Sequence, residues 1–355
     1  MALNQDTQSP VKTENLLYFA QQVLQAEGLS PEHALLVADS LVQADLWGHQ
    51  SHGVLRLPWY VARLRTGAMK ASSEAATLID TGAMLLLDGQ DGVGQVLTDL
   101  AQREAVQRAK IHGVGAVGIR NSNHFGTAMY YTRKAAAEGC VSILTTNASP
   151  AMAPWGGKEK GIGTNPWSIG APYKDGAVVM DIANTAVARG KIYLARQRNE
   201  AIPESWALTP EGMPTTDAAE AVDGVILPMA GHKGYAISFM MDVLSGVLTG
   251  SSSGKNVNGP YRENERSGCG HMFIALDVSS FGSPEDYTER LEQLINEVKE
   301  TPLAHGASEI FIPGELEDRH EAARRAEGTL LLPEQTWADL AKLGHETDVE
   351  LPSRA

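Results

Sequence analysis

The stretch GVGAVGIRNSNHFG, residues 113–126, decides which kind of fold the chain can have. Its first six residues match the glycine pattern of dinucleotide-binding loops. In those loops a strand precedes the glycines and a helix follows, because the helix N-terminus holds the pyrophosphate. Here a predicted helix at 93–111 precedes the glycines, and Gly118 lies inside an apolar strand. The reversed order predicts a helix stop at Gly113 and close backbone packing at Gly115 and Gly118, not a phosphate loop.

The second half of the same stretch, residues 121–126, lies between this strand and a predicted helix at 127–138. Polar side chains at such strand ends commonly bind ligands in α/β proteins, which draws attention to His124. A capping cluster of Asn and Ser with a hydrogen-bonded histidine explains the same residues equally well. From the residues alone, a catalytic and a structural role for His124 both stay open.

The segments around this stretch predict an α/β fold. Helices are expected to end near residues 28, 46 and 65, and a hairpin is expected at 77–89. Alternating helices and strands follow. Downstream, the pattern predicts strands at 141–147, 178–182, 271–279 and 309–315, helices at 185–198, 233–250 and 284–299, and a mostly helical C-terminal part.

Composition limits the classes of partner. A chain of 355 residues with 43% hydrophobic residues favours two domains over one. Its net charge of -14 repels nucleic acid and anionic lipid, so we expect neither as a partner. The N-terminal residues do not resemble an export signal, and no apolar stretch is long enough to span a membrane. With only Cys140 and Cys269 present, the chain suits a reducing cytoplasm.

A second candidate site is GHQSHGVLRLP, residues 48–58. On a helical or turn-like path, Ser51, His52 and Arg56 can converge. An arginine is suited to clamping a carboxylate with two hydrogen bonds, and a histidine is suited to transferring a proton to a carbonyl oxygen. The structural alternative is a helix end with solvated side chains.

The same region permits a function of another class. Asp45, His49 and His52 are spaced at i, i+4 and i+7, which on one helix face could present three ligands to the metal of a hydrolase. Gly48 interrupts the helix that this spacing needs, and no HExxH motif accompanies it. The metal-dependent hydrolase is therefore the less favoured hypothesis.

Four polar turns lie in apolar surroundings, at 147–150, 164–166, 181–185 and 231–234. Backbone amides and hydroxyl groups in such turns can bind a phosphate or a carboxamide. Lys233 adds a positive charge at the start of the long apolar helix. Tight-turn chemistry and a solvated lysine explain these residues as well.

Taken together, the motifs SHGVLRLP (51–58), NSNHFG (121–126), APWGG (153–157), GTNP (163–166), MDIANTAVARGK (180–191) and GHKGY (231–235) closely resemble the malate/L-lactate dehydrogenase family of the sulfolactate dehydrogenase type. The resemblance covers roughly residues 14–315. Each motif alone is weak, but their shared order and separations are specific. This family is unrelated to the lactate and malate dehydrogenases that are built on Rossmann domains.

The resemblance implies an α/β fold with a non-Rossmann, three-layer nicotinamide-binding domain, a mixed seven-stranded sheet, and a helical domain formed by both chain ends. Mapped onto this chain, it predicts an N-terminal helical part for substrate binding and dimerisation at 1–75, the cofactor-binding domain at 76–310 and a returning helical part at 311–355. It also implies a homodimer whose active site lies between domains.

The resemblance further implies hydride transfer between NAD or NADP and a small 2-oxo acid or its 2-hydroxy acid. Ser51 and His52 match the substrate-side motif, with His52 as the proton donor in reduction and Arg56 as the carboxylate ligand. His124 matches another acid/base histidine of the family, so which of the two moves the proton stays open. No metal is needed if an imidazolium stabilises the developing alkoxide.

The expected cofactor contacts are Ser149, Thr164, Asn165, Asp181, Ala183, Asn184, Thr185, Lys233, Gly234, Pro313, Gly314 and Glu315. Family members that act on malate, lactate, sulfolactate, ureidoglycolate, diketogulonate or piperideine-2-carboxylate share the motifs. A cyclic 2-imino acid reductase is therefore the nearest alternative. Tryptophans flank two of the motifs and are candidates for shaping the substrate pocket or for the core: Trp47, Trp59, Trp155 and Trp167.

Overall fold

The computed structural model describes residues 8–355. Its strands are β1 (Gln8–Lys12), β2 (Ala76–Asp80), β3 (Met84–Asp88), β4 (Val114–Ser122), β5 (Cys140–Thr146), β6 (Trp167–Tyr173), β7 (Gly176–Ile182), β8 (Ala207–Leu208), β9 (Val225–Ile226), β10 (Cys269–Asp277) and β11 (Thr329–Pro333). Its α-helices are α1 (Thr13–Ala26), α2 (Pro31–Trp47), α3 (Leu57–Thr66), α4 (Gly94–His112), α5 (Met129–Ala137), α6 (Arg189–Arg198), α7 (Ala218–Asp223), α8 (His232–Asp242), α9 (Pro284–Lys299), α10 (Glu315–Glu327) and α11 (Glu334–Thr347). No helix within this described part is long and apolar enough to cross a membrane.

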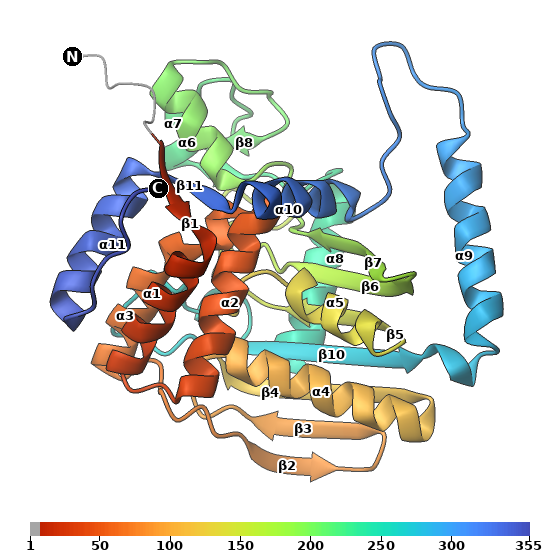
Figure 1. The fold of residues 1–355 in the computed structure, drawn as a ribbon. Coiled ribbons are helices and arrows are strands. Elements are labelled where there is room, and N and C mark those ends of the chain that lie inside the picture. Colours follow the sequence, from red (N-terminus) through yellow and green to blue (C-terminus); the bar gives the residue numbers. More distant parts are fainter. Residues whose placement is uncertain (1–7) are drawn as a thin grey trace.

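A mixed seven-stranded sheet forms the centre of the molecule, in the order β2-β3-β4-β10-β5-β6-β7 (Figure 1). The pair β3 and β4 is parallel, and every other neighbouring pair is antiparallel. Helices α4 and α5 pack on one face, while α8 and the π-helical turn η3 (Val243–Val247) pack on the other. The predicted three-layer, non-Rossmann architecture is confirmed, because a Rossmann sheet is mostly parallel.

The strand directions bring distant loops to one edge of this sheet. Strands β4, β5 and β7 run in the same direction, and β6 and β10 run in the opposite one. The residues that follow β4, β5 and β7 therefore lie at the same edge as the residues that precede β6 and β10. The loops with His124 and Ser149 reach this edge, as do the end of β7 with Asp181 and the segment before β10.

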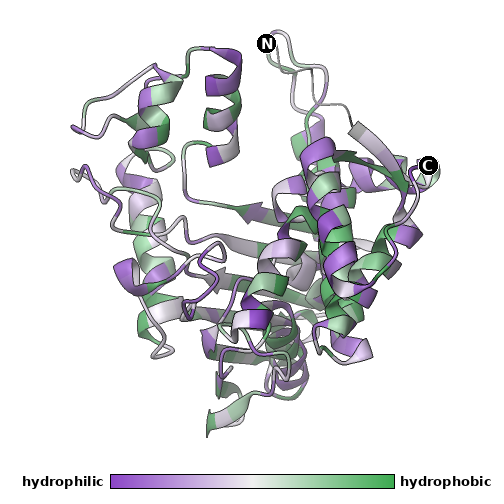
Figure 2. Ribbon diagram, turned by 90° about the vertical axis from the view of Figure 1, so that its left-hand side faces the viewer, coloured by the Kyte–Doolittle hydropathy of each residue, from purple (hydrophilic) through white to green (hydrophobic). Residues whose placement is uncertain are grey.

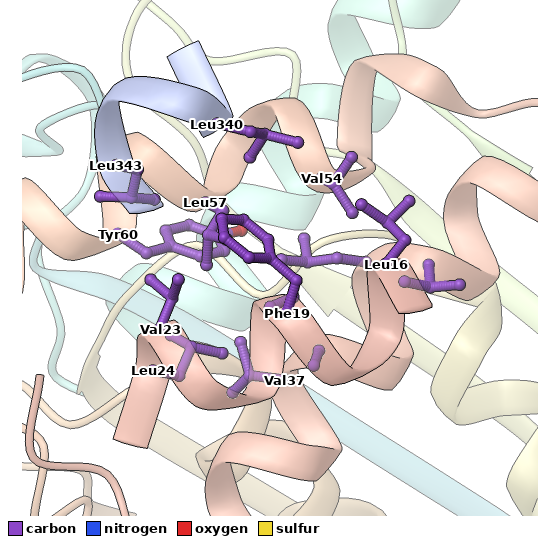
Figure 3. Close-up of a cluster of buried hydrophobic side chains, with 14 of the residues drawn as sticks. Leu16, Phe19, Val23, Leu24, Val37, Val54, Leu57, Tyr60, Leu340 and Leu343 are labelled. Carbon is purple, nitrogen blue, oxygen red and sulfur yellow. The ribbon is translucent and has the colours of Figure 1, made fainter. Parts of the chain in front are cut away.

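The two chain ends build one helical part, as predicted. Strand β1 pairs antiparallel with β11. Figure 3 shows side chains of α1, such as Phe19, beside Leu57 and Tyr60 of α3 and Leu340 and Leu343 of α11, in one buried cluster. Hydrophilic and hydrophobic residues alternate along the helices in Figure 2, a pattern typical of helices that pack with one face against a core. The boundaries at 75 and 310 stay a proposal, and the first seven residues lie outside the described chain.

The glycines of residues 113–118 serve packing. Helix α4 ends at His112, and Gly113 follows with a φ of +81° in the left-handed region. Gly115 lies in β4 directly against α4, where an added Cβ would be 2.0 Å from the Ala105 carbonyl oxygen. At Gly118 an added Cβ would be 3.2 Å from atoms of Leu86 and Thr249. Both roles, the helix stop and the close packing, agree with the order of elements read from the sequence.

Gly115→Ala is expected to destabilise the fold by about 1–3 kcal/mol, because the added methyl group overlaps the backbone of α4. Urea unfolding measures this loss. Gly176→Ala is the matched control, since an added Cβ there would be 3.9 Å from the Tyr173 carbonyl oxygen. A folded Gly115→Ala protein with normal stability and a selective loss of dinucleotide binding would restore the fingerprint hypothesis.

One local prediction was wrong. Residues 309–315, expected as a strand, form no strand; Val179 N–H donates to the Pro313 carbonyl, and the chain then turns into α10. The polar turn expected at 164–166 lies directly before β6, which begins at Trp167. The C-terminal part is mostly helical, as predicted, and also contains β11. Whether residues 309–315 form a strand depends on pairing with a neighbouring strand, which the local pattern does not contain.

Candidate active site

Ser51, His52 and Arg56 lie together on two consecutive 3-10 turns, Gln50–His52 and Val54–Arg56. Helix α2 ends just before them, where Gly48 adopts a φ of +91°. The Ser51 hydroxyl is 2.9 Å from His52 Nδ1, and Arg56 Nε donates to the Ser51 carbonyl at 2.6 Å. The convergence expected from their spacing is therefore present.

Asp45 holds this pair of turns from the inside. Its Oδ2 accepts the Val54 N–H at 2.9 Å, and an added Cβ on Gly53 would be 2.1 Å from its Oδ1. Arg324 of α10 donates to the Asp45 carbonyl at 2.6 Å. Burial raises the pKa of Asp45 to about 7, against the opposing effects of the Val54 N–H and Arg324. The carboxyl group therefore positions the turn that carries His52.

The metal-ligand hypothesis for Asp45, His49 and His52 is wrong on geometry. The Asp45 carboxylate already accepts a hydrogen bond from the Val54 N–H, and His49 Nε2 lies 3.3 Å from Glu317 Oε1. Gly48 ends the helix on which the spacing depended. Across residues 8–355 no group of three His, Cys, Asp or Glu side chains is arranged to hold a metal ion.

His124 follows β4 and is held by its own loop and by α3. Its Nδ1 lies 2.7 Å from the Tyr60 hydroxyl and accepts the Gly126 N–H at 3.3 Å. The preceding Asn123 is buried, accepts from Arg63 at 2.9 Å and donates to the carbonyls of Asp91 and Gly92. This network fixes the backbone, so that His124 has one defined orientation.

The imidazole rings of His52 and His124 stack, with centroids 5.6 Å apart and planes 17° from parallel. Burial, followed by the charges of Arg56 and His49, lowers the pKa of His52 to about 3. Burial also lowers the pKa of His124 well below its usual value, followed by the effects of His52 and Arg56. Both rings are therefore neutral near pH 7 in the unliganded protein.

Arg56 is the cation beside these rings. Its guanidinium carbon lies 4.2 Å from the ring centroid of Trp59, and burial lowers its pKa. Only its Nε takes part in the hydrogen bonds found among residues 8–355, and no ion pair there includes it. A part-buried arginine without a carboxylate partner, in a chain with a net charge of -14, is suited to binding an anion.

Two buried asparagines join the segments predicted to contact the cofactor. Asn165 Oδ1 accepts the Ala148 N–H at 2.9 Å, and its Nδ2 donates to Ser238 of α8 at 2.8 Å. Asn184 Nδ2 donates to the carbonyl of Asn165 at 2.7 Å, and its Oδ1 accepts from Trp167 at 3.2 Å. Their side-chain amides are used inside the protein, so Asn165 and Asn184 hold these loops together.

The remaining predicted contacts fall into two neighbouring groups. Met229 N–H donates to the Asn184 carbonyl, which brings the loop after β7 beside the start of α8. Gly234 is packed so closely that an added Cβ would be 2.3 Å from the Met229 carbonyl oxygen, whereas Lys233 is exposed. Also accessible or half-buried in this first group are Ser149, Thr164, Ala183 and Thr185.

The second group surrounds a cavity of about 320 Å³. Asp181, Pro313 and Gly314 line it together with His49 and Glu317. Asp181 Oδ2 accepts the Met129 N–H at 2.8 Å, and burial raises the pKa of this carboxyl. Glu315 is not among the lining residues; its carboxylate binds Lys299, Arg319 and the Ile312 N–H.

The sequence reading missed Tyr60, Arg63 and Tyr261. Tyr60 follows Arg56 by four residues on the same helical path, a spacing that could have drawn attention to it. Arg63 and Tyr261 gave no such signal in the sequence. Arg63 binds the segment that precedes β10, and Tyr261 is part of that segment. Of the four tryptophans, Trp59 contacts Arg56, Trp47 is buried, Trp167 binds Asn184, and Trp155 is exposed beside His232.

Comparison with known proteins adds to this geometry. Residues 11–341 match the family model described as malate/L-lactate dehydrogenase. A malate/(S)-sulfolactate dehydrogenase from Methanothermus fervidus is 38% identical over 97% of this chain and 98% of its own. A ureidoglycolate dehydrogenase (NAD(+)) from Escherichia coli strain K12 is 34% identical over 90% and 91%. The solved sulfolactate dehydrogenase from Methanocaldococcus jannaschii superposes with a TM-score of 0.92 at 36% identity, covering 96% and 98% of the two chains.

Proposed function

Since the chain belongs to the malate/L-lactate dehydrogenase family, we propose that it interconverts a small 2-oxo acid and its 2-hydroxy acid, with a histidine as acid and base. Relatives in this family use NAD or NADP, and the protein is an NAD(P)-dependent dehydrogenase. The observation that carries the proposal is the stacked pair of neutral histidines beside the unpaired Arg56.

Arg56 binds the substrate carboxylate, with the two terminal nitrogens that have no partner among residues 8–355. This places the neighbouring C2 carbonyl oxygen at the imidazoles of His52 and His124. The bound carboxylate offsets the positive charge of Arg56, which is one cause of the lowered pKa of both rings. One ring can then take up a proton and donate it to the carbonyl oxygen during reduction, or accept it during oxidation. The nicotinamide, when bound, supplies or accepts the hydride.

The residues around the sheet edge fit a dinucleotide. The exposed Lys233, in the first turn of α8, suits its phosphates. The cavity beside Asp181, Pro313 and Gly314 has carboxylate acceptors that suit ribose hydroxyls. We propose the accessible or half-buried Ser149, Thr164, Ala183 and Thr185 as contacts for the rest of the cofactor, with the buried Gly234 beside them at the start of α8. Asn165, Asn184 and Glu315 hold the loops that carry these residues.

We also propose a homodimer in the cytoplasm. The outer side of α8 and η3 exposes Phe239 (50%), Met240 (50%), Val247 (61%) and Leu248 (61%). Contiguous exposed apolar side chains on one helix mark an interaction surface, and a second copy of the chain is the partner we propose. Both cysteines are free and buried, which suits a reducing compartment. Analytical ultracentrifugation tests the dimer, with Phe239→Glu expected to give a monomer.

Fluorescence titration with NADH and NADPH tests the cofactor class, and a turnover assay tests the substrate class. We expect saturable binding of at least one cofactor and reduction of 2-oxo acids. The panel includes a cyclic 2-imino acid, because the same site could protonate an imine nitrogen. Turnover of the imine alone would favour the 2-imino acid reductase over the 2-oxo acid proposal. Failure to bind either cofactor would contradict both.

A further inference from the structure

The segment 257–268 lies between the two halves of the site. It directly precedes β10, and β10 lies between β4 and β5 in the sheet. The loop after β4 carries His124, and the loop after β5 carries Ser149. The sheet topology therefore places this segment between a proposed acid/base residue and a proposed cofactor contact.

The segment is anchored to α3 by its backbone. Arg63 donates to the Arg262 carbonyl at 2.5 Å and to Ser267 Oγ at 3.3 Å. Thr66 donates to the Glu263 carbonyl at 2.5 Å. Because the same Arg63 binds Asn123, next to His124, the segment and the histidine loop share one anchor. Tyr261 is therefore held in place although 56% of its side chain is exposed.

Tyr261 continues a row of side chains that begins at Arg56. The guanidinium of Arg56 stacks on Trp59, and the Trp59 ring meets the Tyr261 ring edge-on, with centroids 6.2 Å apart. The Tyr261 hydroxyl lies 3.5 Å from Ser149 Oγ. The row therefore leads from Arg56, the proposed ligand of the substrate carboxylate, to a pair of hydroxyl groups.

We propose that Tyr261 determines substrate specificity, by donating a hydrogen bond from its hydroxyl to an oxyanion group on C3 of the substrate, with Trp59 as the apolar wall. The substrate class is then a 2-oxo or 2-hydroxy acid with a second carboxylate or sulfonate. The proposal rests on the function proposed above. A phenol hydroxyl next to a second hydroxyl can donate hydrogen bonds to an oxyanion. It offers no comparable interaction to a methyl group at the same position.

Tyr261→Phe tests this with a matched pair of substrates. Oxaloacetate carries a carboxylate on C3, and 2-oxobutanoate carries a methyl group at the same position. For the variant we expect kcat/KM with oxaloacetate to fall about tenfold or more, the scale of a lost hydrogen bond to a charged group. We expect kcat/KM with 2-oxobutanoate and the cofactor Kd to stay within about twofold. Tyr18→Phe, at an exposed tyrosine of α1, is the control and should change neither.

Two results overturn the inference alone. An equal fall for both substrates would mean that Tyr261 acts on the shared part of the molecule. Weaker cofactor binding, without a change in the ratio of kcat/KM for the two substrates, would mean that Tyr261 supports the cofactor contact Ser149. If the wild-type protein reduces no 2-oxo acid of the panel, the proposed function itself fails and the inference fails with it, so the two failures are distinguishable.

Discussion

His124→Ala is expected to lower kcat by about 100-fold or more, and His52→Ala by a similar factor, because each variant loses one ring of the proposed acid/base pair. The rings stack with centroids 5.6 Å apart, so either can reach an oxygen bound between them and Arg56. Steady-state turnover of a 2-oxo acid with saturating cofactor measures the loss. His305→Ala, at an exposed histidine between α9 and α10, is the control.

The pH profile then separates the two rings. The group that donates the proton in reduction must be protonated in the substrate complex, so the rate of reduction falls as pH rises through its pKa. Removing that ring is expected to abolish this fall. If His124 is the donor, removing His52 is expected to move the fall to higher pH, because His52 lowers the pKa of His124. Turnover near the wild-type rate in either variant would remove that histidine from the mechanism.

Arg56→Ala is expected to lower kcat/KM for the 2-oxo acid by about 100-fold or more, because the substrate carboxylate loses two charge-assisted hydrogen bonds. Arg56→Lys should recover only part of this loss, since a lysine ammonium does not form the paired contact. The cofactor Kd, measured by fluorescence, should stay near the wild-type value.

The same substitution has an electrostatic consequence. Arg56 lowers the pKa of both His52 and His124, so its removal should raise the pKa of both rings in the free protein. NMR titration of the histidine resonances measures this shift. An unchanged kcat/KM in Arg56→Ala would contradict its role as the carboxylate ligand, whatever the histidine pKa values do.

The amino-acid sequence by itself determined the class of fold and the local roles of several residues. The order helix, glycines, strand at residues 113–118 excluded a phosphate loop, and Gly115 packs against α4 as that order implied. The short spacing of Ser51, His52 and Arg56 predicted their convergence, because contacts within a single turn depend on nearby residues. The motifs together indicated the family to which the chain belongs.

Only the tertiary structure decided which distant residues meet. His52 and His124 are 72 positions apart in the sequence and stack only because α3 and the loop after β4 pack together. Asn165 and Asn184 looked like ligands, but their amides join loops across the sheet edge. Tyr261 reaches the site because β10 runs antiparallel between β4 and β5. Strand order and direction depend on pairing between segments far apart, and no local periodicity contains that information.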